Sequence, residues 1–309
     1  MRRDTRNWTR REAIRLLAAA GALGLAPPGL LAASGEMIQR TIPASGKGLP
    51  VIGLGTSRVF DVGPSEAALA PLAEVLTILA DHGGSVVDTS PMYGRAEEVT
   101  GRLADRTGLS SKLFLATKVW TEGRAPGIVQ IDESFRLLRT DMIDLIQVHN
   151  LIDWQVHLET LKSLKEEGRI RYAGITHYRT DAFPVLEEVM NAADWDFVQL
   201  NYSILTPEAQ ERLLPLAQER GIAVLVNRPF ERGGTFHQVR NLELPSWAGE
   251  LDIASWGQFF LKWIIGHPAV TCVIPGTSKP KHMLDNVGAG IGRLPDEQQR
   301  KEMRKYVLG

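Results

Sequence analysis

Cysteine is nearly absent from this chain of 309 residues, which contains only Cys272. A single cysteine excludes an internal disulfide and a zinc site built from several thiolates. The seven histidines show none of the spacings by which neighbouring histidines share a metal ion, so no metal site is predicted. An excess of charge is missing as well, because the formal net charge is -1 at pH 7. This balance favours neither nucleic acid nor another polyanion as a partner.

Hydrophobic runs long enough to cross a membrane are also missing. The apolar run from Leu16 to Ala26 has 11 residues, whereas a membrane-spanning helix needs about 20. This run follows an arginine-rich start and precedes small residues, which is the layout of an export signal. The segment "TRREAIR" resembles the twin-arginine (Tat) export motif through Arg10 and Arg11, although Ala13 stands where that motif usually has Phe.

We therefore expect residues 1–33 to be a Tat-type signal peptide that is recognised by the Tat export machinery. Its removal would leave a periplasmic protein without stable membrane insertion. Two other interpretations stay open. The same residues could be the basic N-terminus of a cytoplasmic protein, or an uncleaved segment could anchor the protein in the inner membrane.

Beyond about residue 48 the sequence alternates between two patterns. Short β-branched runs that end in polar residues or glycine predict strands, and longer amphipathic stretches predict helices. The helix patterns at 154–170 and 207–221 stop at Gly168 and Gly221, as expected before a new strand. The predicted strands are 50–56, 85–90, 113–119, 142–149, 172–178, 197–203, 222–229 and 270–277.

The spacing of the strand ends predicts the architecture. Successive ends from Gly55 to Asn227 lie 23 to 33 residues apart, and one βα unit takes about 30 residues. Eight such units predict an α/β fold of the (β/α)₈ TIM barrel class over residues 37–309. A doubly wound sheet is the alternative, but "GLGTSR" lacks the third glycine of a dinucleotide fingerprint. The segment 231–255 is expected to be a long loop.

Three neighbouring strands of this barrel end in ionisable residues. Asp88, Lys118 and His149 end the second, third and fourth strands, and Tyr93 follows in the loop after the second. The carboxyl ends of barrel strands form one rim, where active sites lie. A lysine at a partly buried strand end needs a partner, and we expect Asp88 to be that partner.

These four residue types suit the reduction of a carbonyl group or the reverse oxidation of an alcohol. A phenol has an ordinary pKa of about 10, and a nearby ammonium group favours its ionised form. We therefore expect Lys118 to lower the pKa of Tyr93, so that the phenol gives a proton to an oxygen that gains negative charge. His149 would hydrogen-bond and orient the same oxygen.

The set resembles the active-site tetrad of the aldo-keto reductases, which is Asp, Tyr, Lys and His in that order. "DTSPMYG", "ATKVW" and "IQVHN" carry the matching residues, and the resemblance extends over residues 37 to 309. It implies an NAD(P)-dependent oxidoreductase with a small carbonyl or alcohol as substrate. It also implies that Asp88, Tyr93, Lys118 and His149 are the catalytic residues.

The resemblance further implies a nicotinamide site along the later strand ends. Thr176 and His177 stand where the family has a Ser-Asn pair that holds the carboxamide, and Gln199 matches the carboxamide-binding Gln. Many members carry "YSPL" after the seventh strand, with a Tyr that stacks on the nicotinamide, whereas this chain reads "NRPF". The expected contacts there are therefore Asn227, Arg228, Pro229 and Phe230.

The adenosine end of the cofactor is expected on "IPGTSKPKHMLDN". Many NADPH-preferring members have Lys where Gly276 stands and Arg where His282 stands, so two strong phosphate ligands are missing. NADP(H) stays the expected cofactor and NAD(H) the alternative, with Ser278, Lys279 and Lys281 available for a 2′-phosphate. The expected contacts in this part are Gly276, Thr277, Ser278, Lys281, His282, Asp285 and Asn286, and Thr56 is a further expected cofactor contact.

Two other functions are open at this stage. The barrel could bind a nicotinamide cofactor with little turnover, as a sensor or a partner subunit. It could also be a redox-free lyase or isomerase, although such an enzyme would need a metal or phosphate site. The sequence does not identify the substrate or the oligomeric state.

Overall fold

The structure is a computed structural model that describes residues 35–309. The expected signal peptide at residues 1–33 lies outside these residues. Within residues 35–309, none of the helices has the length and apolarity that crossing a membrane requires.

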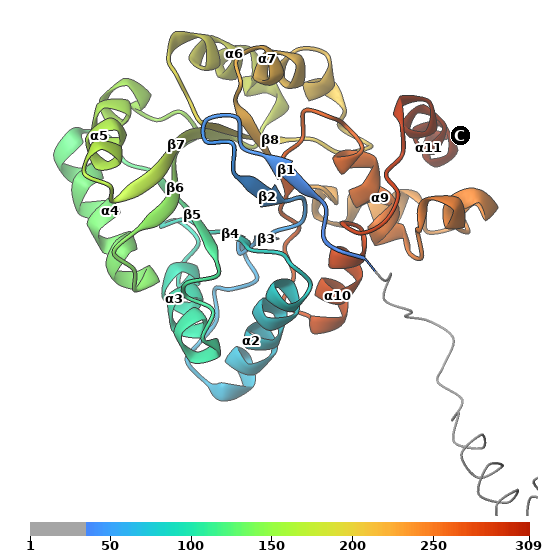
Figure 1. The fold of residues 1–309 in the computed structure, drawn as a ribbon, viewed down its shortest axis with the longest axis horizontal. Helices are drawn as coiled ribbons and strands as arrows, with labels where there is room; N and C mark the ends of the chain where they lie inside the picture. The colour runs from blue at the N-terminus through green and yellow to red at the C-terminus, as the bar shows by residue number, and fades with distance from the viewer. Residues whose placement is uncertain (1–34) are drawn as a thin grey trace, which may run out of the picture. The chain divides into compact units, whose positions relative to one another are not determined.

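Eight parallel strands form the centre of the fold, as the sequence predicts (Figure 1). They are hydrogen-bonded in chain order, and a parallel bridge between Ile52 and Val273 joins the first strand region to the last. The sheet is therefore a nearly closed (β/α)₈ barrel. The strands are β3 (Leu54–Gly55), β4 (Val86–Asp88), β5 (Phe114–Val119), β6 (Ile143–His149), β7 (Ile170–His177), β8 (Phe197–Asn201), β9 (Ala223–Asn227) and β10 (Cys272–Val273).

Helices surround the strands on the outside, and further helices follow β10 (Figure 1). Several begin at residues whose side chains cap the helix N-terminus. Ser65 and Ser255 accept hydrogen bonds at two helix N-termini, and Asp296 forms a capping box with Gln299. The helices are α2 (Glu66–Asp81), α3 (Ala96–Thr107), α4 (Arg124–Leu138), α5 (Trp154–Glu166), α6 (Phe183–Ala192), α7 (Leu213–Glu219), α9 (Trp256–Ile265), α10 (Pro280–Gly288) and α11 (Glu297–Leu308).

A short antiparallel hairpin, β1 (Gln39–Thr41) with β2 (Gly48–Pro50), closes one end of the barrel. Figure 1 shows it across the strands near the centre of the molecule. The neighbouring residues Ile42 and Leu49 share an apolar cluster with Phe114 and Phe197, which are the first residues of β5 and β8. The amino ends of the strands are therefore covered, and a ligand has access at the opposite, carboxyl ends.

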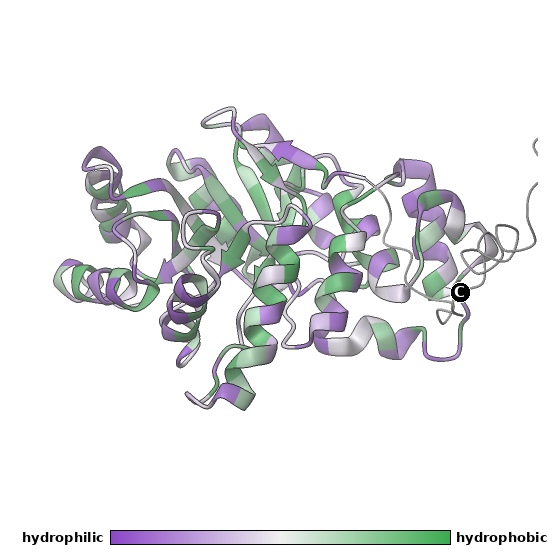
Figure 2. Cartoon of the chain, turned by 60° about the horizontal axis from the view of Figure 1, so that its bottom comes forward, coloured by the Kyte–Doolittle hydropathy of each residue, from purple (hydrophilic) through white to green (hydrophobic). Residues whose placement is uncertain are grey.

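Burial on both faces explains the near-continuous apolar sequence of the strands. Every residue of β5, β6 and β8 is buried, as expected for parallel strands between an inner core and a layer of helices. Figure 2 shows hydrophobic strands at the centre, whereas the helices carry hydrophilic positions among their hydrophobic ones. Polar side chains inside this frame, such as Lys118, therefore need an explanation.

Two predicted segments differ from the structure. The helix expected at 207–221 divides into a 3₁₀ turn, η2 (Glu208–Gln210), and the short helix α7. Pro215 explains the break, because it has no N–H to donate to the preceding turn. The expected loop at 231–255 contains η3 (Glu231–Gly233), α8 (Gly234–Gln238) and η4 (Ser246–Leu251). Segments this short give little periodic signal in a sequence.

Candidate active site

A large cavity opens at the carboxyl ends of the barrel strands. Its volume is about 1070 Å³, at the upper end of ordinary ligand pockets. Its lining includes Asp88, Tyr93 and His149, together with residues that follow β3, β7, β9 and β10. The cavity thus joins the reactive residues to the region where the sequence predicts a cofactor.

Asp88 is the centre of a buried hydrogen-bond network under this cavity. It is the last residue of β4, and it is 2% exposed. Its Oδ2 accepts from Lys118 Nζ at 2.7 Å. Its Oδ1 accepts from Gln199 Nε2 at 2.8 Å and from Gln147 Nε2 at 3.1 Å. Both carboxylate oxygens are therefore satisfied by donors on β5, β6 and β8, which fixes the side chain in place.

Lys118 is completely buried, and its ammonium group is satisfied by two acceptors. Besides Asp88, it donates to the backbone oxygen of Thr89 at 2.7 Å. Burial works to lower the pKa of Lys118, but the charges of Asp88 and Tyr93 outweigh it and the pKa is raised. The lysine is therefore a fixed cation, and the predicted ion pair with Asp88 is present.

Tyr93 lies in the loop between β4 and α3, with its ring centroid 5.1 Å from Lys118 Nζ. The expected lowering of the pKa of Tyr93 is wrong. Burial raises the pKa of Tyr93, and the opposing effect of Lys118 is smaller. The ammonium charge alone predicts the wrong direction, because the burial of a loop residue is not visible in a strand pattern. The phenol is therefore protonated at neutral pH, as a proton donor must be.

His149 faces the same cavity from the end of β6. Its ring packs edge-on against Tyr93, with 6.1 Å between centroids. Its Nδ1 lies 3.2 Å from Ser90 Oγ. Burial, aided by the charge of Lys118, lowers the pKa of His149 to about 3. The imidazole is therefore neutral, and with Nδ1 facing Ser90, Nε2 is the nitrogen available to a ligand.

Two of the predicted carboxamide-binding residues, Thr176 and Gln199, form a connected group with Asn227 beside Asp88. Gln199 Oε1 accepts from Thr176 Oγ1 at 3.2 Å and from Asn227 Nδ2 at 3.3 Å. Asn227 Oδ1 is buried and has no hydrogen-bond partner among residues 35–309. Such an atom calls for a donor. The N–H₂ group of a nicotinamide carboxamide would supply one, so these residues fit the cofactor.

Another hydrogen-bonded group in the lining of the cavity is built around Asp285 on α10. Its Oδ2 accepts from Ser255 Oγ at 2.7 Å, and its Oδ1 accepts from Gln258 Nε2 at 3.1 Å. Gly276, Thr277, His282 and Asn286 line the cavity in the same region.

Five of the predicted cofactor residues do not line the cavity, which is lined instead by their neighbours. The ring of His177 stacks on that of Tyr178, which does line the cavity, and its Nδ1 accepts from Arg179 N at 3.2 Å. Thr56 Oγ1 donates to the backbone oxygen of Asp88 at 3.0 Å, so it positions that strand end. The residues outside the lining are Thr56, His177, Pro229, Ser278 and Lys281.

Several residues of the site were not predicted from the sequence. Gln147 bridges to Asp88, and Ser90 holds His149. The alternation of strands could have indicated Gln147, because it precedes the inward-facing His149 by two positions. Others lie on loops, where no periodicity applies. The unpredicted lining residues include Ser57, Arg58, Asp61, Met92, Tyr178, Arg232, Phe236 and Trp256.

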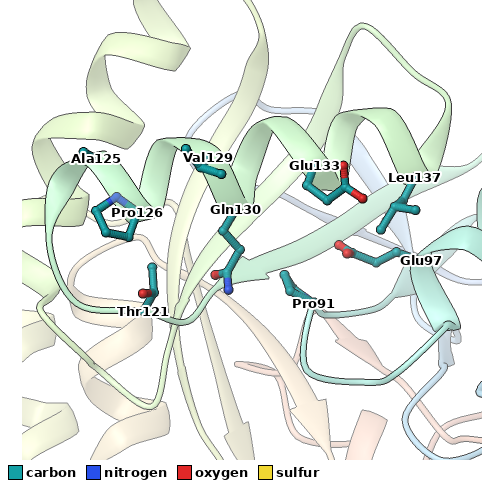
Figure 3. A pocket seen from close by; sticks show the side chains of 9 residues that line it. All are labelled: Pro91, Glu97, Thr121, Ala125, Pro126, Val129, Gln130, Glu133 and Leu137. Carbon is teal, nitrogen blue, oxygen red and sulfur yellow. The ribbon is translucent and has the colours of Figure 1, made fainter.

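A second cavity, of about 610 Å³, lies between α4 and the loop that precedes α3 (Figure 3). Neither Tyr93 nor His149 lines it. It contains the buried carboxyl of Glu97, whose Oε1 accepts from Thr117 Oγ1 at 2.5 Å. Burial raises the pKa of Glu97. Its lining residues are Pro91, Glu97, Thr121, Ala125, Pro126, Val129, Gln130, Glu133 and Leu137.

Comparison with known proteins agrees with this geometry. Residues 51–305 match the model of the aldo/keto reductase family. The chain is 28% identical to the methylglyoxal reductase YeaE of Escherichia coli, over 81% of this chain and 89% of the relative. It is 26% identical to the aldo-keto reductase Str7 of Strobilurus tenacellus, over 81% and 90%.

Among solved structures, the fold is similar to an aldo/keto reductase from Klebsiella pneumoniae in complex with NADP and acetate. The TM-score is 0.74 and the sequence identity is 26%. The alignment covers 87% of this chain and 96% of that structure.

Proposed function

This chain belongs to the aldo/keto reductase family, and from that premise we propose that it uses NADP(H) to reduce a small aldehyde or ketone to an alcohol, or catalyses the reverse reaction. One observation carries the proposal. A buried Asp88–Lys118 ion pair, a protonated phenol at Tyr93 and a neutral imidazole at His149 meet at one end of a large cavity. A barrel that only bound the cofactor would not need a positioned proton donor.

The chain's own residues would orient and protonate the substrate oxygen. Bound NADPH supplies a hydride to the carbonyl carbon. Tyr93 gives its phenolic proton to the carbonyl oxygen, so that one hydride and one proton complete the alcohol. Lys118 stabilises the phenolate that remains, and water then reprotonates it. His149 donates a hydrogen bond to the same oxygen and orients it.

Residues along the later strand ends would hold the cofactor. Thr176, Gln199 and Asn227 are placed for the carboxamide, and the β10–α10 segment for the adenosine part. Because NADP is the nucleotide in a solved structure of similar fold, NADP(H) is favoured over NAD(H). The complete set proposed for the cofactor is Thr56, Thr176, His177, Gln199, Asn227, Arg228, Pro229, Phe230, Gly276, Thr277, Ser278, Lys281, His282, Asp285 and Asn286.

The test compares NADPH oxidation by the wild-type protein and by the Tyr93→Phe variant with a panel of small carbonyls. Methylglyoxal is the first to try, because one relative is a methylglyoxal reductase. Loss of general acid catalysis should lower kcat by about 10²- to 10⁴-fold, while NADPH binding persists. Tyr306→Phe is the matched control, since that exposed phenol lies on α11. Equal turnover by Tyr93→Phe and wild type would contradict the role of Tyr93.

We also propose that residues 1–33 direct the folded barrel, formed by residues 37–309, to the periplasm through Tat. The supporting observation is the Tat-like arginine pair ahead of a cofactor-binding barrel. Free NADPH is not expected in the periplasm, so the enzyme would leave the cytoplasm with its nucleotide bound and recycle it between two substrates.

Two measurements test this export. Replacing Arg10 and Arg11 together by Lys should keep the protein in the cytoplasm. Mature protein from the periplasm, once denatured, should release about one NADP(H) per chain. Mature protein without nucleotide would contradict export with the cofactor, and normal export of the double Lys variant would contradict the Tat route.

A further inference from the structure

Arg228 follows the last residue of β9 in a strained conformation. Its φ is 50°, in the left-handed region that residues other than glycine seldom adopt. The turn is closed by a hydrogen bond from Glu231 N to Arg228 O at 3.0 Å. Strain of this kind persists where the surroundings require a particular side-chain direction. The direction here is towards Tyr178.

The guanidinium group of Arg228 is held on an aromatic surface. Its central carbon lies 3.9 Å from the centroid of the Tyr178 ring. That ring stacks in turn on His177, with 5.7 Å between centroids and 11° between planes. A guanidinium fixed by its face keeps its N–H edge free for an oxyanion.

No carboxylate among residues 35–309 forms an ion pair with Arg228. The neighbouring arginine on the other loop, Arg179, is paired with Asp181. The acid nearest to Arg228 in the chain, Glu231, is engaged elsewhere. Its Oε1 accepts from Ser203 Oγ at 3.0 Å and from Thr206 Oγ1 at 2.9 Å.

Arg228 is also the most buried of the arginines that line the cavity. It is half-buried, whereas Arg58 and Arg232 are exposed. Its pKa is lowered, chiefly by burial. Arg228 and Tyr178 share the cavity with Tyr93 and His149. The charge of Glu231 acts on Arg228 without forming an ion pair, and a partly desolvated cation without an ion-pair partner gains from an anion that enters the cavity.

We propose that Arg228, held in place by Tyr178, is an anion-binding residue at the reactive end of the cavity. Its ligand is a phosphate or carboxylate oxyanion. Two sources share this chemistry, namely a phosphate of the cofactor and a carboxylate on the substrate. The inference rests on the proposed function, because both sources belong to the same reaction.

The experiment uses the full-length protein and the variants Arg228→Gln, Arg228→Lys and Tyr178→Leu. The control is Arg139→Gln, which removes one positive charge at an exposed ion pair with Asp105. Binding of NADPH and NADP+ is measured without turnover, by calorimetry at low and high salt. The second arm compares kcat and KM for succinic semialdehyde, which carries a carboxylate, with those for butanal, which does not.

If the anion is a phosphate of the cofactor, Arg228→Gln raises the Kd of both nucleotides by about tenfold or more, and the wild-type advantage shrinks in high salt. If it is a carboxylate of the substrate, nucleotide Kd is unchanged. In that case KM for succinic semialdehyde rises by a similar factor while KM for butanal does not. Either result supports the proposal. Arg228→Lys should recover part of the loss, and Tyr178→Leu should reproduce part of it.

The proposal is overturned if Arg228→Gln leaves both nucleotide Kd values and both KM values within twofold of the Arg139→Gln control. Failure of the proposed function gives a different result. The wild-type protein would then neither bind NADPH nor reduce either aldehyde, whatever residue stands at position 228.

Discussion

Lys118 Nζ lies 2.7 Å from Asp88 Oδ2, in a pair of side chains that are 0% and 3% exposed. A charged pair this deeply buried is costly to form, and it is maintained only by close geometry and additional hydrogen bonds. Asp88 accepts two of these from Gln199 and Gln147, and Lys118 gives one to Thr89. The pair therefore links four strands and places the cation beside Tyr93.

Breaking this pair from one side should destabilise the barrel. Lys118→Met leaves a buried carboxylate without its counter-ion, and Asp88→Asn leaves a buried ammonium group. Each should lower the free energy of unfolding by about 3–5 kcal/mol, measured by urea denaturation. The double variant Asp88→Asn/Lys118→Met should be more stable than either single one, because no unpaired charge remains. Single variants as stable as wild type would contradict the description of the pair as isolated from water.

The pH dependence of kcat/KM for reduction should show no histidine ionisation. Since the pKa of His149 is lowered to about 3, the imidazole stays neutral throughout the range in which histidines usually titrate. Burial raises the pKa of Tyr93, so the phenol stays protonated at neutral and mildly alkaline pH. The profile should therefore be flat from about pH 5 to 9 and fall only in more alkaline solution. An acid limb centred near the ordinary histidine pKa of about 6.5 would contradict a neutral His149.

Ser90 should act as a positioning residue for His149. Its Oγ lies 3.2 Å from Nδ1, so Ser90→Ala removes one hydrogen bond worth about 1 kcal/mol. We expect kcat/KM to fall roughly fivefold with NADPH binding unchanged. Ser163→Ala is a suitable control, because that hydroxyl hydrogen-bonds only within the surface of α5. The role is contradicted if Ser90→Ala and Ser163→Ala have the same kcat/KM.

Glu97 should make the stability of the fold depend on pH in a direction opposite to that of a salt-bridged acid. Burial raises its pKa in the folded protein above the unfolded value of about 4.3. Between these two pKa values the folded state binds more protons than the unfolded state, so the stability of the wild-type protein decreases as pH rises. Glu97→Gln should remove this decrease, and its stability relative to wild type should improve across that window.

Glu133 provides the control for Glu97, since it lines the same cavity. Its hydrogen bond to Arg136 lowers the pKa of Glu133. Glu133 therefore makes the stability of the fold increase as pH rises, which is the opposite of the effect of Glu97. A Glu97→Gln variant whose stability relative to wild type falls with rising pH would contradict a raised pKa. Urea denaturation at a series of pH values makes the comparison.

Sequence patterns predicted the barrel because the strand pattern occurs eight times along the chain. The strand ends recur at βα spacing, and parallel strands buried on both faces produce apolar runs that are easy to locate. The rim position of Asp88, Lys118 and His149 follows from the same repeat. The ion pair could be predicted because adjacent strands bring opposite charges together.

The rest of the site depends on local geometry that the periodicity of strand and helix patterns does not reveal. Arg228 has a positive φ and lies over the ring of Tyr178, and neither feature is visible in the letters "NRPF". The pKa of Tyr93 depends on how far its loop is covered. His177 was expected in the cavity by analogy with its family position, yet its ring stacks on Tyr178 and Tyr178 takes the place in the lining.

The most direct test of the central claim is transfer of a labelled hydride. NADPH carrying deuterium at the transferable C4 position is incubated with the purified protein and methylglyoxal or another accepted carbonyl, and the alcohol is examined by mass spectrometry. One deuterium per alcohol is expected with the wild-type protein, and almost no product with Tyr93→Phe. A protein that binds NADPH tightly but forms no labelled alcohol from any carbonyl tested would contradict the claim and would favour a cofactor-binding role without turnover.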